Sequence, residues 1–223
     1  MARADGFAPE ELIAFVAGDE PSGEPGRHFA YSDTHYILLG LIIEKATGRR
    51  YYDLAREMLI VPMALTSTTP LTGRDHPGLA TGYQRSGVAR MIAGVSGPSV
   101  SRGRLVAVPD FEWTGGGFVT TPADLAKFYH MLFADPRFSE IASMMLADVN
   151  VNPISEGREY GLGVFVRERL EGDRLSHGGD FMGYGSFVMF DRETGLTVAV
   201  MTNDGDFEAS ELAIQILSGL TQR

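Results

Sequence analysis

Arg174-Leu-Ser-His-Gly-Gly-Asp-Phe-Met-Gly-Tyr-Gly-Ser-Phe-Val-Met-Phe-Asp-Arg-Glu-Thr-Gly-Leu-Thr-Val-Ala-Val-Met-Thr-Asn203 is the stretch that decides the fold class. Apolar residues recur in it with a period near two, which predicts strands rather than helices. Residues 192–195 (Arg-Glu-Thr-Gly) are typical of a hairpin turn, with glycine where the backbone needs a positive φ. We therefore expect consecutive antiparallel strands at residues 163–170, 174–177, 185–191 and 196–202.

Upstream of Tyr160 the apolar period is near 3.6, which predicts helices. Ser32 or Asp33 can cap the strongest of these, and Gly48 can end it. Residues 66–116 are rich in Gly, Pro, Ser and Thr, and we expect an irregular segment with short strands near 80–83 and 105–108. The expected helices span residues 8–16, 32–45, 52–59, 122–132, 139–146 and 207–220. This order predicts an α+β fold: a mainly helical and loop part (1–160), then an antiparallel sheet with a C-terminal helix (161–223).

Composition excludes several classes of function. The 223 residues include no cysteine, which excludes a disulfide framework or a thiolate metal site. The net charge of −10 disfavours nucleic acid or an anionic membrane surface as the main partner. The longest apolar run, residues 36–43, is about eight residues, far short of the ~20 that span a bilayer. The N-terminus lacks the apolar core of a signal peptide, and the compartment stays open.

Other local patterns are weak. The five histidines (28, 35, 76, 130 and 177) form no His-x-x-x-His pair, so we expect no metal or cofactor, although a zinc site of carboxylates and scattered histidines stays open. Residues 32–35 contain Ser, Asp and His, but capping of a helix explains Ser32 better than a local triad. A nucleophile elbow centred on Ser186 fails, because positions 184 and 188 are Tyr and Val.

Two segments carry a specific resemblance. Residues 25–48 contain Tyr31-Ser32-Asp33 and an apolar helix, and residues 175–183 contain His177-Gly178-Gly179. With residues 62–68 and 115–124, they resemble the serine β-lactamase and penicillin-binding-protein-like superfamily. The branch is that of class C β-lactamases, D-alanyl-D-alanine carboxypeptidases and related esterases. The resemblance implies a β-lactamase/transpeptidase-like fold, here its C-terminal two-thirds without the N-terminal strands and the nucleophile helix.

The resemblance also implies site residues. Tyr31 takes the position of the catalytic general base, and His177, Gly178 and Gly179 match the His-x-Gly form of the substrate-binding strand motif. Asp33 stands where asparagine is commoner, and a carboxylate accepts hydrogen bonds without donating them. If the resemblance is set aside, Tyr31 is simply a tyrosine packed at the start of a helix. His177 is then a histidine on an edge strand whose hydrogen bonds are satisfied within the protein. The two glycines are then spacers that let strands approach closely.

The family's nucleophile motif, Ser-x-x-Lys, is absent from this sequence. The only lysines are Lys45 and Lys127, and the residues three positions before them are Ile42 and Asp124. A tyrosine with a pKa near ~10 is a poor base at neutral pH unless a cation favours its phenolate. We therefore expect the chain alone to be inactive, with Tyr31 and His177 facing one cleft.

Three hypotheses remain open on function. The first is a serine hydrolase that acts by acyl transfer on a β-lactam, a D-amino peptide or an ester, with its nucleophile supplied elsewhere. The second is a non-catalytic ligand-binding or regulatory module of the same fold, and the third is an unrelated α+β protein that matches by chance. In the first two, the missing strands leave a surface uncovered, which predicts a homo-oligomer or a missing N-terminal segment.

Overall fold

The computed structural model describes residues 6–24, 26–27, 29–84, 97–107, 109, 111–147, 152–155, 158–167 and 173–221. Parts of the expectations above lie outside these residues: positions 25 and 28 of the first motif segment, position 108, and 168–170 of an expected strand.

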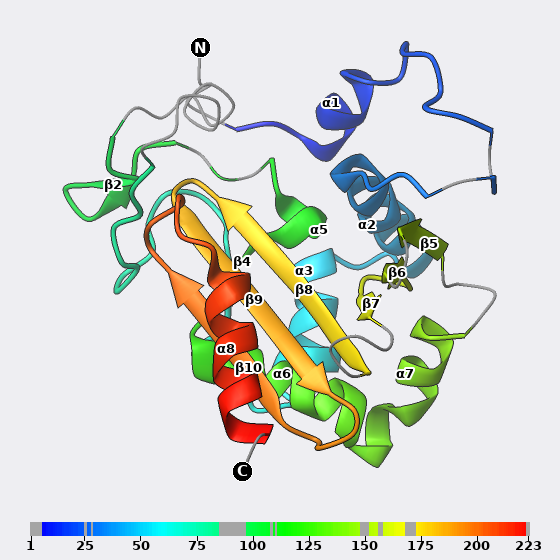
Figure 1. The fold of residues 1–223 in the computed structure, drawn as a ribbon. Helices are drawn as coiled ribbons and strands as arrows, with labels where there is room; N and C mark the ends of the chain where they lie inside the picture. The colour runs from blue at the N-terminus through cyan, green and yellow to red at the C-terminus, as the bar shows by residue number, and fades with distance from the viewer. Residues whose placement is uncertain are drawn as a thin grey trace.

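A six-stranded antiparallel sheet forms the centre of the molecule (Figure 1). Its strands follow one another in the order β10-β9-β8-β7-β6-β5, so each strand pairs with its neighbour in the sequence. This arrangement confirms the expected antiparallel meander. The strands are β5 (Asn152–Ser155), β6 (Arg158–Tyr160), β7 (Phe165–Arg167), β8 (Arg174–Phe181), β9 (Tyr184–Asp191) and β10 (Thr197–Thr202).

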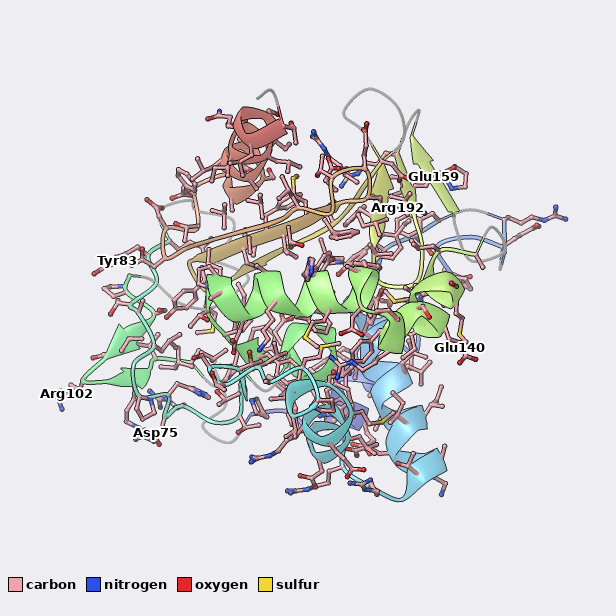
Figure 2. The ribbon with its side chains drawn as sticks, turned by 90° about the horizontal axis from the view of Figure 1, so that it is seen from below. Asp75, Tyr83, Arg102, Glu140, Glu159 and Arg192 are labelled. Carbon is pink, nitrogen blue, oxygen red and sulfur yellow. The ribbon has the colours of Figure 1, made fainter. Side chains whose placement is uncertain are left out.

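Helices cover both faces of the sheet. The C-terminal helix α8 (Ala209–Thr221) packs on β9 and β10 from one side, and α6 (Pro122–Ala134) packs on the same strands from the other. Figure 2 shows α8, the sheet and α6 as successive layers, with α2 and α3 beyond α6. The remaining helices are α1 (Pro9–Ala14), α2 (Asp33–Thr47), α3 (Tyr51–Ala55), η1 (Arg56–Ile60), α5 (Trp113–Gly116), η2 (Pro136–Phe138) and α7 (Ser139–Met145). No helix in the described ranges has the length and apolar character that a membrane crossing requires.

The period of two distributes the strand side chains between two cores. Val188 and Phe190 of β9 join the cluster under α6, where they meet Tyr129. Met189, between them in the sequence, joins the cluster under α8 with Leu217. The alternation seen in the sequence is therefore the alternation between two helical layers.

The structure corrects several expected boundaries. The sheet begins at Asn152, before the change of period, because β5 and β6 are short strands that a periodicity argument does not resolve. β8 continues past His177 to Phe181, since Gly178 and Gly179 still pair with β9. No strand spans 80–83, where Tyr83 makes a single bridge to Asp204. The irregular segment has two small pairs instead: β1 (Thr69–Pro70) with β4 (Phe118–Val119), and β2 (Val100–Ser101) with β3 (Arg104–Leu105).

Helix α2 ends as expected, at Gly48 with a φ of 67°. Ser32 occupies its N-cap position, but the Ser32 side chain makes no capping hydrogen bond. The buried face of α2 contains Ile37 and Gly40, and Gly40 lies against Trp113 and Thr114 of α5. The apolar residues that predicted the helix lie on its exposed side and are 37–53% exposed: Leu38, Leu39, Ile42 and Ile43.

Candidate active site

A large open cleft of about 1600 Å³ lies beside the start of α2 and the end of β8. Its walls include Tyr31 and Asp33 from the first motif segment. They also include His177, Gly178 and Gly179 from the second. The structure therefore brings all five expected site residues to one cavity.

The Tyr31 and His177 rings lie close together, with ring centres 6.2 Å apart. Tyr31 precedes α2, and its ring also meets the edge of Tyr160 at 5.9 Å between centres. The Tyr31 side chain is accessible from the cleft, because the residue is 45% exposed. The expectation that Tyr31 and His177 face one cleft is confirmed.

The environment of Tyr31 is acidic. Partial burial is the main cause that raises the pKa of its phenol above the ordinary value. The neighbouring Asp33 carboxylate, which hydrogen-bonds the phenol, raises the pKa further, and Tyr36 and Glu112 add to the effect. Tyr31 is therefore protonated at neutral pH in this chain, the opposite of what a general base requires.

Glu112 is a cleft residue that the sequence analysis missed. Burial, followed by repulsion from Asp33, raises the pKa of its carboxyl to about 7. Its Oε2 atom lies beside the α5 turn, where a Cβ at Gly116 would be in ordinary van der Waals contact with it at 3.5 Å. The next residue, Trp113, has a φ of 31°, a left-handed conformation that is uncommon for a bulky residue. The feature that distinguishes this turn is the positive φ of Trp113, a residue other than glycine. The sequence gives no sign of this conformation, which is why Glu112 was missed.

Both ring nitrogens of His177 have partners within the protein. Nδ1 lies 2.7 Å from the carbonyl oxygen of Gly178, and Nε2 lies 3.2 Å from the hydroxyl of Tyr160. The Tyr160 hydroxyl in turn lies 2.8 Å from that of Tyr36. Burial lowers the pKa of His177, against smaller opposite effects of the Gly178 carbonyl and Asp33. Tyr160 and Tyr36 are further site residues without a signal in the sequence, since their contact joins segments far apart.

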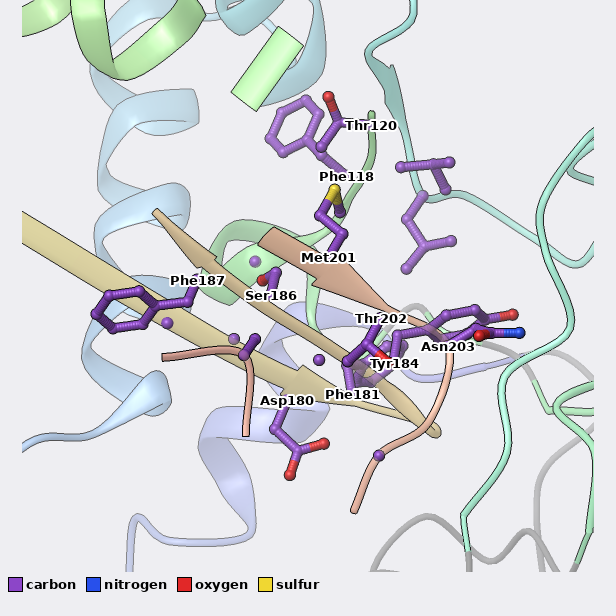
Figure 3. A pocket seen from close by; sticks show the side chains of 18 of the residues that line it. Phe118, Thr120, Asp180, Phe181, Tyr184, Ser186, Phe187, Met201, Thr202 and Asn203 are labelled. Carbon is purple, nitrogen blue, oxygen red and sulfur yellow. The ribbon is translucent and has the colours of Figure 1, made fainter. Parts of the chain in front are cut away.

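Gly178 and Gly179 leave space for the side chains of β9. In the register of the sheet, Gly178 is opposite Phe187 and Gly179 is opposite Ser186. A Cβ at Gly179 would lie 2.9 Å from the Ser186 hydroxyl oxygen, so the close-approach interpretation of these glycines has a structural basis. Figure 3 shows this end of the cleft, where the Met201 side chain extends from β10 toward Phe118.

Among the charged side chains of the cleft, acidic ones predominate. Its described lining contains four carboxylates and one guanidinium. The guanidinium belongs to Arg158, whose Cζ lies 4.4 Å from the centre of the Phe165 ring. Within the described ranges, no three His, Cys, Asp or Glu residues gather in a way that could hold a metal ion. The four acids are Asp33, Glu112, Asp180 and Glu208.

Comparisons with known proteins show the family of the chain and its fold. The sequence model of the Beta-lactamase family matches residues 1–221. Penicillin-binding protein 4* of Bacillus subtilis is 25% identical over 211 residues, which are 92% of this chain and 47% of that protein. A D-stereospecific amidohydrolase from a Streptomyces species superposes with a TM-score of 0.78 at 26% identity, over 96% of this chain and 61% of that one.

The octameric penicillin-binding protein homologue from Pyrococcus abyssi shares the fold, with a TM-score of 0.73 and 23% identity. The match covers 98% of this chain and 50% of that homologue. This chain therefore spans about half the length of the Bacillus and Pyrococcus proteins that it resembles.

Proposed function

Because the chain belongs to the β-lactamase family, we propose that it forms the general-base and substrate-binding part of a serine hydrolase that works by acyl transfer. The observation that carries this proposal is the convergence of Tyr31 and His177, from distant segments, on one large cleft. The substrate classes are those of the family: a β-lactam, a D-amino peptide or an ester. The Streptomyces neighbour is a D-stereospecific amidohydrolase, and this similarity adds support for amide substrates.

The proposed chemistry needs a serine and a lysine that this sequence does not place in a Ser-x-x-Lys motif. A lysine ammonium near Tyr31 would counter the acidic neighbours and favour the phenolate. The phenolate would then take the serine proton while the serine oxygen attacks the substrate carbonyl. The proton passes to the leaving group, and water later hydrolyses the acyl-enzyme. Tyr31 is the catalytic residue of this proposal, and Asp33, His177, Gly178 and Gly179 bind substrate.

The exposed apolar side of α2 is the surface that we propose for the segment with this motif. Four neighbouring aliphatic side chains there are 37–53% exposed, from Leu38 to Ile43. An apolar stripe of this kind on a helix normally packs against another element. The longer relatives contain about as much chain again, and α2 begins two residues after Tyr31. A segment on this face would therefore lie next to the proposed base.

The test is to fuse the chain behind the segment of a longer family member that carries its Ser-x-x-Lys. Hydrolysis of a chromogenic β-lactam, a D-amino acid nitroanilide and a short-chain nitrophenyl ester is then measured for the fusion and the chain alone. We expect turnover of at least one substrate by the fusion and none by the chain. The control is the same fusion with the motif serine replaced by alanine. A folded fusion without activity toward any substrate class would contradict the proposal.

The second candidate is a ligand-binding or regulatory module of the same fold. The raised pKa of Tyr31 favours this second candidate. A protonated phenol can hydrogen-bond a ligand, but it cannot act as a base. An inactive fusion that still binds β-lactams or peptides would support this module.

A further inference from the structure

We propose that Tyr160 and Tyr36 are positioning residues that hold His177 as the neutral Nδ1–H tautomer, so that the β8 wall of the cleft offers substrate no positive charge. This inference concerns the same cleft, and its relevance to catalysis rests on the proposed function. The evidence for it is a chain of hydrogen bonds from Gly178 to Tyr36, in which each donor can be identified from the chemistry of its partner.

The direction of the first bond follows from the chemistry of a carbonyl. The Gly178 oxygen, 2.7 Å from His177 Nδ1, can only accept a hydrogen bond. Nδ1 therefore carries a proton. In a neutral imidazole, the other nitrogen, Nε2, then has only a lone pair to offer.

The remaining bonds take their directions from this assignment. Tyr160 lies 3.2 Å from Nε2 and must donate its hydroxyl proton to that lone pair. Its oxygen then accepts from the Tyr36 hydroxyl at 2.8 Å. Tyr160 is only 5% exposed, so water competes little for its hydroxyl. A charged His177 would have to donate from Nε2, so the Tyr160 hydroxyl could no longer give its proton to the ring.

The groups that face His177 come from several elements. Asp33, at the start of α2, favours the charged ring, and so does the Gly178 carbonyl on β8 itself. Burial outweighs both and lowers the pKa of His177. Tyr31 contributes a neutral ring, and Phe165 of β7 contributes another, 5.3 Å away between centres. The Arg158 guanidinium lies over the Phe165 ring, with its Cζ 4.4 Å from the centre of that ring.

This assignment narrows the substrate class. A neutral His177 with both nitrogens in use does not attract a carboxylate, and four of the five side chains with a full charge in the described lining are carboxylates. We therefore infer that the substrate group at the β8 wall is an uncharged amide or ester, not the free carboxylate of a β-lactam or of a peptide C-terminus.

The test uses ¹⁵N-labelled chain and the long-range ¹H–¹⁵N spectrum of the histidine rings, in which the two nitrogens of each tautomer have distinct shifts. The His177→Gln variant identifies the His177 signals. We expect the Nδ1–H tautomer and a pKa below the ordinary histidine value. In Tyr160→Phe, which removes the donor to Nε2, we expect at least about a fivefold rise in the Nε2–H fraction and a higher pKa.

Two further variants support the interpretation of the spectrum. Tyr36→Phe removes the outer bond and should change the tautomer in the same direction but less. Tyr51→Phe, which removes a half-buried hydroxyl of α3 outside this chain of bonds, should change nothing. An Nε2–H tautomer in the unmodified chain, or a His177 signal indifferent to Tyr160→Phe, would overturn the assignment.

Ligand binding to the chain tests the substrate class without any turnover. At pH 7.5 we expect 3-phenylpropionamide to bind at least about fivefold more tightly than 3-phenylpropionate, as measured by shifts of the His177 signals. Equal or tighter binding of the carboxylate, or no binding of either compound, would overturn this inference. An inactive fusion enzyme would overturn the proposed acyl transfer but would leave these two measurements unaffected.

Discussion

Tyr31 and His177 lie with their ring centres 6.2 Å apart in one cleft, although one precedes α2 and the other lies within β8. Asp33 is a neighbour of both: it raises the pKa of the tyrosine and opposes the lowering of that of the histidine. In the isolated chain the pair consists of a protonated phenol and an imidazole that burial keeps neutral. A cation beside this pair would favour the phenolate of Tyr31, which the acidic neighbours disfavour.

The first prediction concerns Tyr31 in the fusion with a Ser-x-x-Lys segment. Tyr31→Phe should lower kcat by ~10²–10⁴, the usual contribution of a general base. The loss should persist across the pH range, because phenylalanine cannot ionise. Steady-state kinetics with the preferred substrate measure it.

Tyr83→Phe is the matched control for this prediction. Tyr83 is 47% exposed, close to the 45% of Tyr31, but it does not line the cleft. We expect kcat within about twofold of the unmodified fusion for this variant. Equal losses in the two variants would show that Tyr31 acts through stability and not as the base.

The second prediction concerns Glu112 and pH. Its folded-state pKa of about 7 is raised above the ordinary value, so between pH 4.5 and 7 the folded protein binds more protons than the unfolded chain. The free energy of unfolding therefore falls as pH rises through this window and levels off above it. Glu112→Gln removes this loss. Because Glu112 is partly exposed, the variant should gain ~1–2 kcal/mol relative to the unmodified chain between pH 4.5 and 8.

Urea unfolding of the two proteins at pH 4.5, 6 and 8 measures this difference. Glu10→Gln, on an exposed side of α1, serves as the control for the removal of a surface carboxylate. A constant difference between Glu112→Gln and the unmodified chain would mean that folding does not shift the pKa of Glu112.

The sequence predicted the parts of this protein that depend on local patterns. The period of two in 185–202 predicted β9 and β10. The helix expected at 122–132 is α6, and at its start the Thr121 side chain accepts a hydrogen bond from the Asp124 amide. The family motifs predicted that Tyr31 and His177 would meet. These signals work because spacing and caps act within a few residues, or because a motif is already known.

The parts that the sequence did not predict depend on contacts between distant segments. The hydroxyls of Tyr36 and Tyr160 meet across 124 positions, and no local feature indicates it. The helical period of α2 was right, but the period alone does not say which stripe is buried. The structure buries Ile37 and Gly40 and leaves Leu39 and Ile42 exposed.

The third prediction compares two helical glycines. A Cβ at Gly40 of α2 would collide with Thr114 and Trp113, and both belong to a helix whose backbone is already constrained by the positive φ of Trp113. Gly40→Ala should therefore lower the free energy of unfolding by ~1–3 kcal/mol.

Gly219 of α8 is the comparison, because a Cβ added there would have nothing within 4 Å. Gly219→Ala should raise that free energy by ~0.5–1 kcal/mol through helix propensity alone. Thermal and urea unfolding of both variants measure the two changes in the free energy of unfolding, which should have opposite signs. A stabilising effect of Gly40→Ala would show that α2 and α5 can move apart.

The last prediction concerns the exposed apolar side of α2 and the segment proposed to cover it. Ile42 of α2 and Leu220 of α8 are both 53% exposed, so replacement of either by glutamate should change the free energy of unfolding of the chain by less than ~0.5 kcal/mol. If α2 receives the Ser-x-x-Lys segment, only Ile42→Glu places a charge in that interface. Added as a separate peptide, the segment should then bind Ile42→Glu at least about tenfold more weakly, because a buried unpaired carboxylate is costly. Leu220→Glu should bind it like the unmodified chain. Titration calorimetry measures both affinities, and sedimentation at the same concentrations shows whether the chain instead self-associates through this face. Equal affinities of the two variants would place the segment elsewhere on the molecule.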